Sequence, residues 1–330
     1  MSAYDLLPES TWEFKLVEVD SATSFYTSSV HFDWVSAEEQ HIVNDVVKTV
    51  RDKGNCGIAI DVGMNDGFYS MLFAALGCEV FSFEIQPRCI DVATSVALKN
   101  NFSTHIKVYE SPVTARVGES VRVPMGAKSI GSCDGGFSIH VENPGQSAHI
   151  PFEQIGARYL RGSQLDDMFL DASDEIAYIK VDTEGHEFDV FQGALALFRE
   201  RKIEKLVFEA SNTLWDDLDR AKLSILDEII GYGYDMKCSL SQQLITAKDL
   251  LTRPSDCGVD IFVERRIGMA IKLDKPQNER KRADIRVDAF TEFTEAISYD
   301  SSFPVLAFIS VTIYLILWKY LRKKHVWRWL

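Results

Sequence analysis

The fold of this chain is decided by residues 58–70, which read IAIDVGMNDGFYS. The first five residues are a short apolar run with one carboxylate, Asp61, near its end, as expected for a buried strand. Gly63 and Gly67 follow, and they permit a sharp turn and a close approach of backbone or ligand. Apolar residues then recur at the spacing of one helix face, namely Phe68, Met71, Leu72 and Ala75. The stretch therefore predicts a strand, a glycine-containing turn and a helix, the unit that opens nucleotide-binding α/β sheets.

A turn of this kind can belong to either of two classes of nucleotide-binding site. The dinucleotide fingerprint G-x-G-x-x-G, counted from Gly63, requires glycine where this chain has Asn65 and Phe68, so a nicotinamide site is disfavoured. The pattern D-x-G-x-N-x-G fits at every position. The next apolar run ends with Glu84, 23 residues after Asp61, close to the spacing of an acid that binds ribose. A carboxylate at that point can hold both ribose hydroxyls.

Strands and helices alternate along the rest of the chain. Apolar runs at 106–110, 176–181, 203–208 and 258–263 predict strands, and helices are predicted from Pro87 to about residue 100, after residue 187 and at 218–230. This alternation predicts an α/β fold with a doubly wound, mainly parallel, Rossmann-like sheet. Residues 113–150 contain six glycines and predict an irregular β insertion that forms a wall of the substrate site.

A third segment, residues 179–187, reads IKVDTEGHE and follows the fourth predicted strand directly. Its carboxylates, Asp182, Glu184 and Glu187, crowd the end of a central strand. Because Gly185 interrupts the run, the chain can turn all three toward one crevice. Glu187 has a structural alternative, because it can simply stabilise a helix N-terminus through the helix dipole.

The three segments together resemble the signatures of FkbM-type methyltransferases, which are class I S-adenosylmethionine-dependent enzymes. The resemblance covers about residues 55–265, and it departs after the third strand, where Glu110-Ser-Pro112-Val replaces the usual Asn-x-Ala-Leu. It implies S-adenosylmethionine as the cofactor. The positions that it assigns to the cofactor site are Asp61, Gly63, Asn65, Gly67, Tyr69, Ser70, Glu84 and Pro87.

Methyl transfer from a sulfonium requires positioning of donor and acceptor, and removal of a proton when the acceptor is a hydroxyl. Asp182 is the first candidate for orienting or deprotonating that hydroxyl. His186 is the second, because its unperturbed pKa lies near neutrality, although it can also be a solvent-facing residue at a helix start. Glu184 and Glu187 are assigned to the substrate. No metal is predicted: zinc spacing is absent from the sequence, and a Mg²⁺ bound by the carboxylates remains an alternative.

Composition limits the possible partners. The 330 residues carry a net charge of −14, which disfavours nucleic acid as a partner. The resemblance implies that the acceptor is a hydroxyl of a sugar, lipid or small metabolite. The six cysteines show no C-x-x-C spacing and are interpreted as small buried residues in a reducing compartment. A non-catalytic membrane adaptor that retains the fold is the alternative function.

The C-terminal part predicts a membrane anchor. Residues 303–321 are 19 residues without an acidic side chain and with a single Lys near the end, long enough as a helix to cross a bilayer. A buried C-terminal helix is the alternative. The predicted organisation is an N-terminal arm and helix (1–54), a methyltransferase domain (55–265), a linker (266–302), the transmembrane helix (303–321) and a basic tail (322–330). With no N-terminal signal pattern, a tail-anchored protein with a cytosolic domain is expected, in the endoplasmic reticulum or mitochondrial outer membrane.

Overall fold

The computed structural model describes residues 13–28, 39–125, 133, 156–210, 220–252 and 257–267. All of them belong to the first of two units into which the chain divides, residues 1–271 and 272–330. Within these described ranges, no helix combines the length and the apolar character needed to cross a membrane. The predicted linker beyond residue 267, the transmembrane helix and the basic tail lie outside the described residues.

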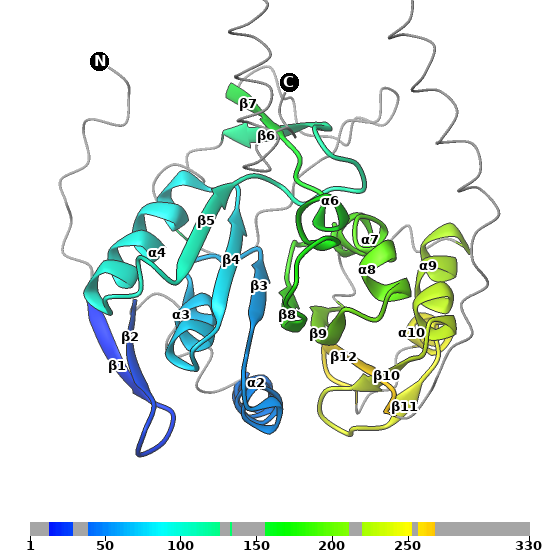
Figure 1. Ribbon diagram of the computed structural model, residues 1–330. Coiled ribbons are helices and arrows are strands. Elements are labelled where there is room, and N and C mark those ends of the chain that lie inside the picture. Colours follow the sequence, from blue (N-terminus) through cyan, green and yellow to red (C-terminus); the bar gives the residue numbers. More distant parts are fainter. Residues whose placement is uncertain are drawn as a thin grey trace, which may run out of the picture. The chain divides into compact units, whose positions relative to one another are not determined.

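One eight-stranded sheet forms the centre of the described unit, in the order β11-β10-β12-β9-β8-β3-β4-β5 (Figure 1). Five neighbouring strands are parallel, as the sequence predicted: β3 (Ile58–Val62), β4 (Glu79–Glu84), β5 (Ile106–Glu110), β8 (Ile176–Val181) and β9 (Ile203–Glu209). The other three pair antiparallel: β10 (Tyr234–Cys238), β11 (Leu244–Ile245) and β12 (Asp260–Arg265). The sheet is therefore mixed. The sequence pattern missed β10 and β11, because they form a short hairpin with a half-exposed pattern at the sheet edge.

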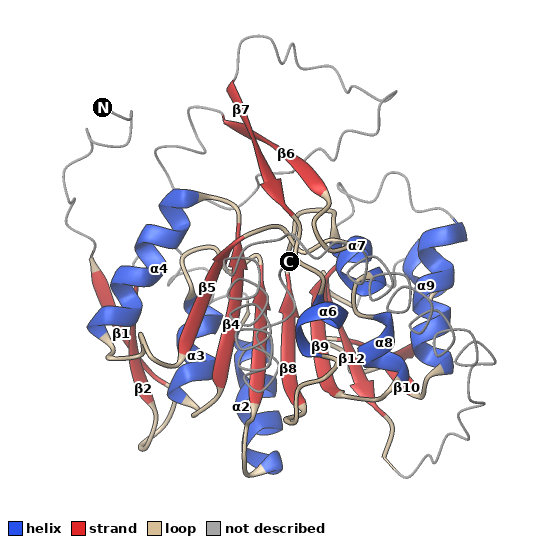
Figure 2. Ribbon diagram, turned by 45° about the horizontal axis from the view of Figure 1, so that its top comes forward, coloured by secondary structure: helices blue, strands red, loops and turns tan. Residues whose placement is uncertain are grey.

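Helices cover both faces of the sheet, which makes it doubly wound (Figure 2). The strand residues of β3 and β8 are buried throughout, because side chains on both of their faces meet helices. One face packs against α2 (Gln40–Lys53), α3 (Phe68–Ala75) and α4 (Pro87–Lys99). The other packs against α6 (Leu165–Phe169), α7 (Glu187–Gln192), α8 (Leu195–Arg199), α9 (Arg220–Gly231) and the short α10 (Asp249–Thr252).

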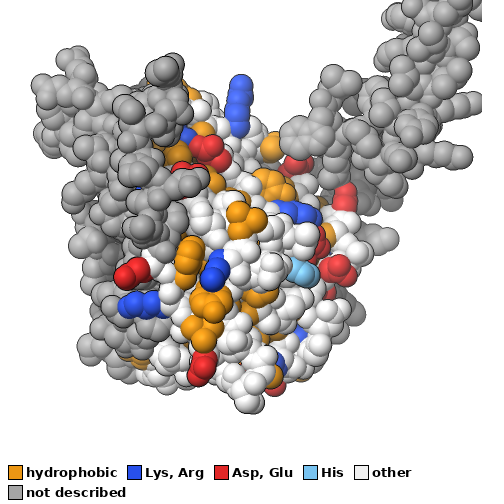
Figure 3. Space-filling model, turned by 90° about the vertical axis from the view of Figure 1, so that its left-hand side faces the viewer, with side chains coloured by type: hydrophobic (Ala, Val, Ile, Leu, Met, Phe, Trp, Pro, Cys, Tyr) orange, Lys and Arg blue, Asp and Glu red, His pale blue; other side chains and the backbone are white. Residues whose placement is uncertain are grey.

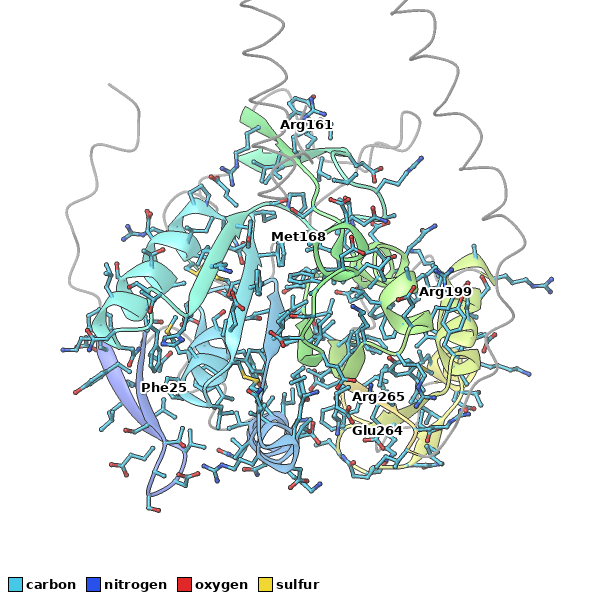
Figure 4. The ribbon with its side chains drawn as sticks, in the orientation of Figure 1. Phe25, Arg161, Met168, Arg199, Glu264 and Arg265 are labelled. Carbon is cyan, nitrogen blue, oxygen red and sulfur yellow. A yellow bond between two sulfur atoms is a disulfide. The ribbon has the colours of Figure 1, made fainter. Side chains whose placement is uncertain are left out.

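The described part of the N-terminal arm is a β-hairpin of β1 (Phe14–Glu18) and β2 (Ser24–Ser28). Phe25 of β2 is buried, and its ring packs edge-to-face on Phe68 of α3 with 5.5 Å between centroids (Figure 4). Figure 3 shows this side of the molecule, where hydrophobic side chains are scattered among charged ones. The hairpin thus covers the outer surface of α3 and α4 instead of joining the central sheet.

The predicted β insertion begins as a two-stranded antiparallel ribbon, β6 (Ser120–Met125) and β7 (Gly156–Arg161). Figure 1 shows the ribbon beyond the carboxyl ends of β4 and β5. Residues 126–155, with the exception of Cys133, lie outside the described residues. The inner side chains of the ribbon, Val121 and Val123, are buried against Ile85 and Leu160.

The cysteines are paired, contrary to the prediction of isolated buried thiols. The three disulfides are Cys56–Cys78, Cys89–Cys133 and Cys238–Cys257 (Figure 4). The partners are 22, 44 and 19 residues apart in the sequence, so their spacing carries no signal of pairing. The fold brings each pair of Cα atoms to within 4.9 Å, inside the range of a disulfide.

Candidate active site

A cavity of about 1060 Å³ opens at the carboxyl edge of the parallel strands. This is the edge at which open α/β sheets bind their ligands. Loops after β3, β4, β5, β8 and β9 line it, together with the start of α2 and the segments that follow β10 and precede β12. The sequence-predicted residues that the fold brings to this lining are Gly63, Asn65, Tyr69, Glu84, Asp182, Glu184 and His186.

The turn after β3 passes directly beside the turn after β8. Gly63 has a φ of 77°, and a Cβ there would lie 1.8 Å from the carbonyl oxygen of Asp182. Gly67 has a φ of 87°, and a Cβ there would lie 2.9 Å from that of Ala93 in α4. Both conformations favour glycine, and both positions lack space for a side chain. These glycines therefore bring the first turn against Asp182 on one side and against α4 on the other.

Glu84 is buried at the end of β4, and its carboxylate organises the loops around it. Oε2 accepts a hydrogen bond from the amide of Asn65 (2.9 Å), and Oε1 accepts from the amides of Ile85 (2.7 Å) and Gln86 (2.8 Å). Burial raises the pKa of Glu84 to about 7, although these amides oppose the shift. A carboxylate has about four lone-pair positions, so three are used and one, on Oε2, is left for a ligand. The expectation that Glu84 holds both ribose hydroxyls stays a prediction, and this lone-pair position is the one that the three amides leave open.

Other predicted cofactor residues lie beneath or beside the cavity. Asp61 is fully buried and accepts a hydrogen bond from the Ser70 hydroxyl at 2.6 Å, and the Ser70 hydroxyl lies 2.7 Å from that of Ser82. Burial raises the pKa of Asp61 to about 6. Pro87 is the first residue of α4. Asp61, Ser70, Gly67 and Pro87 are not among the residues that line the cavity.

Asp182 is held by a lysine that the sequence analysis did not single out. Lys180 of β8 donates to Asp182 Oδ2 at 2.8 Å and lies over the ring of Tyr69, with Nζ 5.0 Å from its centroid. Burial disfavours the charge on Lys180, but Asp182, Glu39 and Asp61 outweigh it and raise its pKa above the usual range. The Tyr69 hydroxyl in turn donates to Glu39 at 2.7 Å. Asp182 therefore points into the cavity with one oxygen fixed by a charged partner.

The remaining residues of the third segment separate into two groups. Glu184 and His186 line the cavity, and the ring Nδ1 of His186 lies 3.3 Å from a carboxylate oxygen of Asp189. Glu187 is 1% exposed and accepts from the amides of Thr183 and Gly185, both at 3.1 Å. The expectation that Glu187 faces the substrate is wrong for this reason: its carboxylate satisfies the amides of its own turn.

Glu209, at the end of β9, is a site residue that sequence reasoning passed over. Its carboxylate oxygen and those of Asp182 and Glu184 lie within 4.8 Å of one another. Burial, together with the charges of Asp182 and Glu184, raises the pKa of Glu209 to about 8. Among the residues that the structure describes, these three are the carboxylates close enough to share a cation. Its position in the sequence could have revealed it, because Glu209 ends a parallel strand just as Asp182 directly follows one.

The far side of the cavity is formed by the start of α2 and the antiparallel end of the sheet. The Nε2 atom of His41 lies 3.0 Å from the hydroxyl of Ser239 and 3.6 Å from a carboxylate oxygen of Asp260. Leu240 and Val259 complete this side. The sequence offered no signal for Ser239, Leu240, Val259 and Asp260, because the pairing of β10 with β12 brings the segments that carry them to the carboxyl edge.

Comparison with known proteins agrees with this geometry. The profile of the methyltransferase FkbM domain matches residues 61–236, which is more than half of the chain. The chain belongs to the FkbM methyltransferase family. No curated protein matches the sequence.

Several solved structures match the chain at low sequence identity. An S-adenosylmethionine-dependent methyltransferase from Agrobacterium tumefaciens is 13% identical, with a TM-score of 0.41, over 78% of this chain and 72% of that one. The N-terminal domain of human METTL16 is 13% identical, with a TM-score of 0.36, over 70% and 69%. A putative caffeoyl-CoA O-methyltransferase from Staphylococcus aureus is 10% identical, with a TM-score of 0.35, over 71% and 90%.

The residues of this FkbM domain fit the cofactor that the family implies. The turn at Gly63 has no side chain that would block a ligand, and the unused lone pair on Glu84 suits a ribose hydroxyl. Ile85, Ser111 and Pro112 line the cavity where β4 and β5 end, and they offer an apolar and polar surface for a base. The part of the cavity that suits the methyl donor therefore extends over the ends of β3, β4 and β5. Asp182, which follows β8, lies between this part and β9.

Proposed function

We propose that the protein is an S-adenosylmethionine-dependent methyltransferase that O-methylates a hydroxyl of a sugar, lipid or other small metabolite at a membrane. The observation that carries the proposal is the contact between the first turn and the end of β8. Because Gly63 lies against the carbonyl of Asp182, a donor on that turn and an acceptor beside the Asp182 carboxylate are neighbours. Short distance and fixed orientation are the main requirements of this reaction.

The chain's own residues have distinct roles in this proposal. The turn at Gly63 and Asn65, with Glu84 behind it, holds the cofactor, which supplies an activated methyl group when bound. Asp182 would accept a hydrogen bond from the acceptor hydroxyl and orient its oxygen, and it would take the proton as the C–O bond forms and the bond between the methyl carbon and the sulfonium sulfur breaks. Lys180 keeps Asp182 in place. His186 lines the same cavity and is the second proton acceptor.

We also propose that residues 303–321 anchor the protein in a membrane with the methyltransferase domain in an oxidising compartment. The three disulfides support this placement over the cytosolic one expected from the sequence, because such bonds persist mainly in oxidising compartments. A basic tail, residues 322–330, then remains in the cytosol, as the positive-inside rule requires. Alkylation of the native protein tests this: all six cysteines should react only after reduction. Labelling of all six without a reductant would contradict the placement.

Calorimetric titration with S-adenosylmethionine tests the enzymatic proposal. Binding is expected at micromolar to millimolar ligand, and no heat at millimolar ligand would favour the non-catalytic adaptor. NADH serves as the control ligand, and tight NADH binding would point to an oxidoreductase instead. An activity screen with labelled donor against lipid and glycan extracts then identifies the acceptor, and transfer to nucleic acid would contradict the predicted class.

A further inference from the structure

The side of the cavity beyond β8 has a surface that we call the acceptor wall, formed by Glu209, Leu240 and Val259. Glu209 ends β9, Leu240 follows β10 and Val259 precedes β12, and all three line the cavity. In the sheet order these strands lie on the opposite side of β8 and β3 from Glu84 and β4. Leu240 and Val259 also lie after residue 236, where the match to the family domain ends. Two of the three residues of the wall thus lie beyond the part of the chain that the family profile matches, and Glu209 lies within it.

Two large aliphatic side chains of the wall are exposed side by side. Leu240 is 58% exposed and Val259 is 54% exposed. The Ser239 amide donates to the carbonyl of Asp260, so the segments that carry the pair run side by side, and a Cβ on Gly258, next to Val259, would be 3.1 Å from the Leu240 side chain. A single exposed aliphatic residue is ordinary on a protein surface. An adjacent pair at the mouth of a ligand cavity differs, because a ligand that covers both removes their apolar surface from water.

The polar groups next to this apolar pair are acidic. Glu209 is the cross-strand neighbour of Asp260, and its carboxylate lies within 4.8 Å of those of Asp182 and Glu184. Lys180 is the lysine of the cavity lining, and its ammonium is bonded to Asp182. The described residues that line the cavity include eight carboxyl side chains against one lysine and two histidines, so an anionic acceptor would meet an excess of acidic groups. Neutral hydroxyl groups can instead donate hydrogen bonds to these carboxylates.

We propose that the acceptor wall selects a neutral, hydroxylated acceptor with an apolar group attached to it, and rejects anionic acceptors of the same shape. The inference rests on the proposed methyl transfer at this cavity and adds the chemical class of its substrate. The apolar group covers Leu240 and Val259, and the hydroxylated part faces Glu209 and Asp182. A glycoside with an apolar aglycone has this chemistry.

Three matched glycosides test the inference by binding to the full-length protein saturated with S-adenosylhomocysteine. The probes are phenyl β-D-glucoside, methyl β-D-glucoside and phenyl β-D-glucuronide, measured by calorimetry or saturation-transfer NMR. Phenyl glucoside should bind at least about tenfold tighter than methyl glucoside, since burial of the equivalent of two methylene groups gives that factor. It should also bind tighter than the glucuronide, which differs by one negative charge.

Three variants assign the preference to the wall. Leu240→Ser should remove most of the difference in affinity between phenyl glucoside and methyl glucoside. Leu244→Ser is the matched control, because Leu244 is 61% exposed but does not line the cavity, and the preference should persist. At pH 9, where Glu209 with its pKa of about 8 is ionised, Glu209→Gln should narrow the difference in affinity between phenyl glucoside and phenyl glucuronide.

Equal binding of the phenyl and methyl probes, or binding of neither, would overturn the acceptor wall. So would a glucuronide that binds as tightly as the glucoside, or a Leu244→Ser variant that behaves like Leu240→Ser. The S-adenosylmethionine titration separates this result from a failure of the proposed function. When the cofactor binds and the probes show no preference, only the wall is refuted; when the cofactor does not bind, the enzymatic proposal fails, whatever the probes do.

Discussion

The buried carboxyl of Glu84 should make the ligand-free protein less stable as the pH rises toward neutrality. Its pKa is raised from 4.5 in the unfolded chain to about 7 in the folded one. Between these values the folded state holds a proton that the unfolded state has released, so the free energy of unfolding falls with increasing pH. Each pH unit corresponds to about 1.4 kcal/mol, so the total loss for this group is about 3 kcal/mol. The stabilising contribution is fully present below pH 4.5 and is gone above about pH 7.

The assay is urea unfolding of wild type and Glu84→Gln at pH 5, 6, 7 and 8. Glutamine resembles the protonated carboxyl and does not titrate, so the wild type should lose about 2.5 kcal/mol relative to the variant between pH 5 and pH 8. Glu79→Gln, at the exposed start of the same strand, controls for the change of side chain. Parallel stability curves for wild type and Glu84→Gln would refute the argument, because they would mean that Glu84 titrates alike in both states.

Four further predictions concern the donor and acceptor sides of the cavity. Asp182→Asn should leave donor affinity nearly unchanged and reduce the single-turnover rate by about 10²–10⁴-fold, and equal losses of both would move Asp182 to the cofactor site. Glu84→Ala should weaken S-adenosylmethionine binding more than tenfold in calorimetry, since a charge-assisted hydrogen bond contributes roughly 1.5–3 kcal/mol; unchanged affinity would remove Glu84 from the site. Gly63→Ala should abolish activity or folding, as circular dichroism and turnover will show, because its Cβ has no room beside Asp182; a fully active variant would contradict that contact. Replacing Cys89 and Cys133 together by serine should lower the affinity for S-adenosylmethionine more than the same change at the Cys238–Cys257 pair does. Equal losses of affinity would contradict a role of the Cys89–Cys133 disulfide near the donor.

The donor side of the cavity was accessible from the sequence because it is built from one local motif. The strand, turn and helix at residues 58–75 follow from apolar spacing and from glycines that the turn requires. Positions after parallel strands then predicted Glu84 and Asp182, since these strand ends meet at one edge. The motif did not reveal which of its side chains line the cavity and which are buried beneath it. Asp61 has the spacing of a ligand residue, yet it is buried against Ser70.

The acceptor side escaped prediction because it depends on contacts between distant segments. Leu240 and Val259 are unremarkable in sequence, and they meet only because β10 pairs antiparallel with β12. Glu187 shows the opposite error. Its carboxylate in an acidic run suggested the substrate, but a left-handed Glu184 and Gly185 fold the turn so that its amides point to Glu187. Backbone hydrogen bonding within a turn decided the outcome, and residue type alone does not reveal it.

The disulfides connect the two sides of the cavity to the proposed compartment. On the donor side, the Oδ1 atom of Asn65 lies 2.7 Å from Sγ of Cys133 and 3.5 Å from that of Cys89, so this bond braces the first turn against α4. On the acceptor side, Cys238–Cys257 joins the end of β10 to the segment before β12, two residues from Leu240 and from Val259. The donor side and the acceptor side of the cavity are thus each stabilised by a disulfide that would be reduced in a reducing compartment. An enzyme that works in the cytosol would lose both braces, so the geometry of the site itself argues for an oxidising compartment.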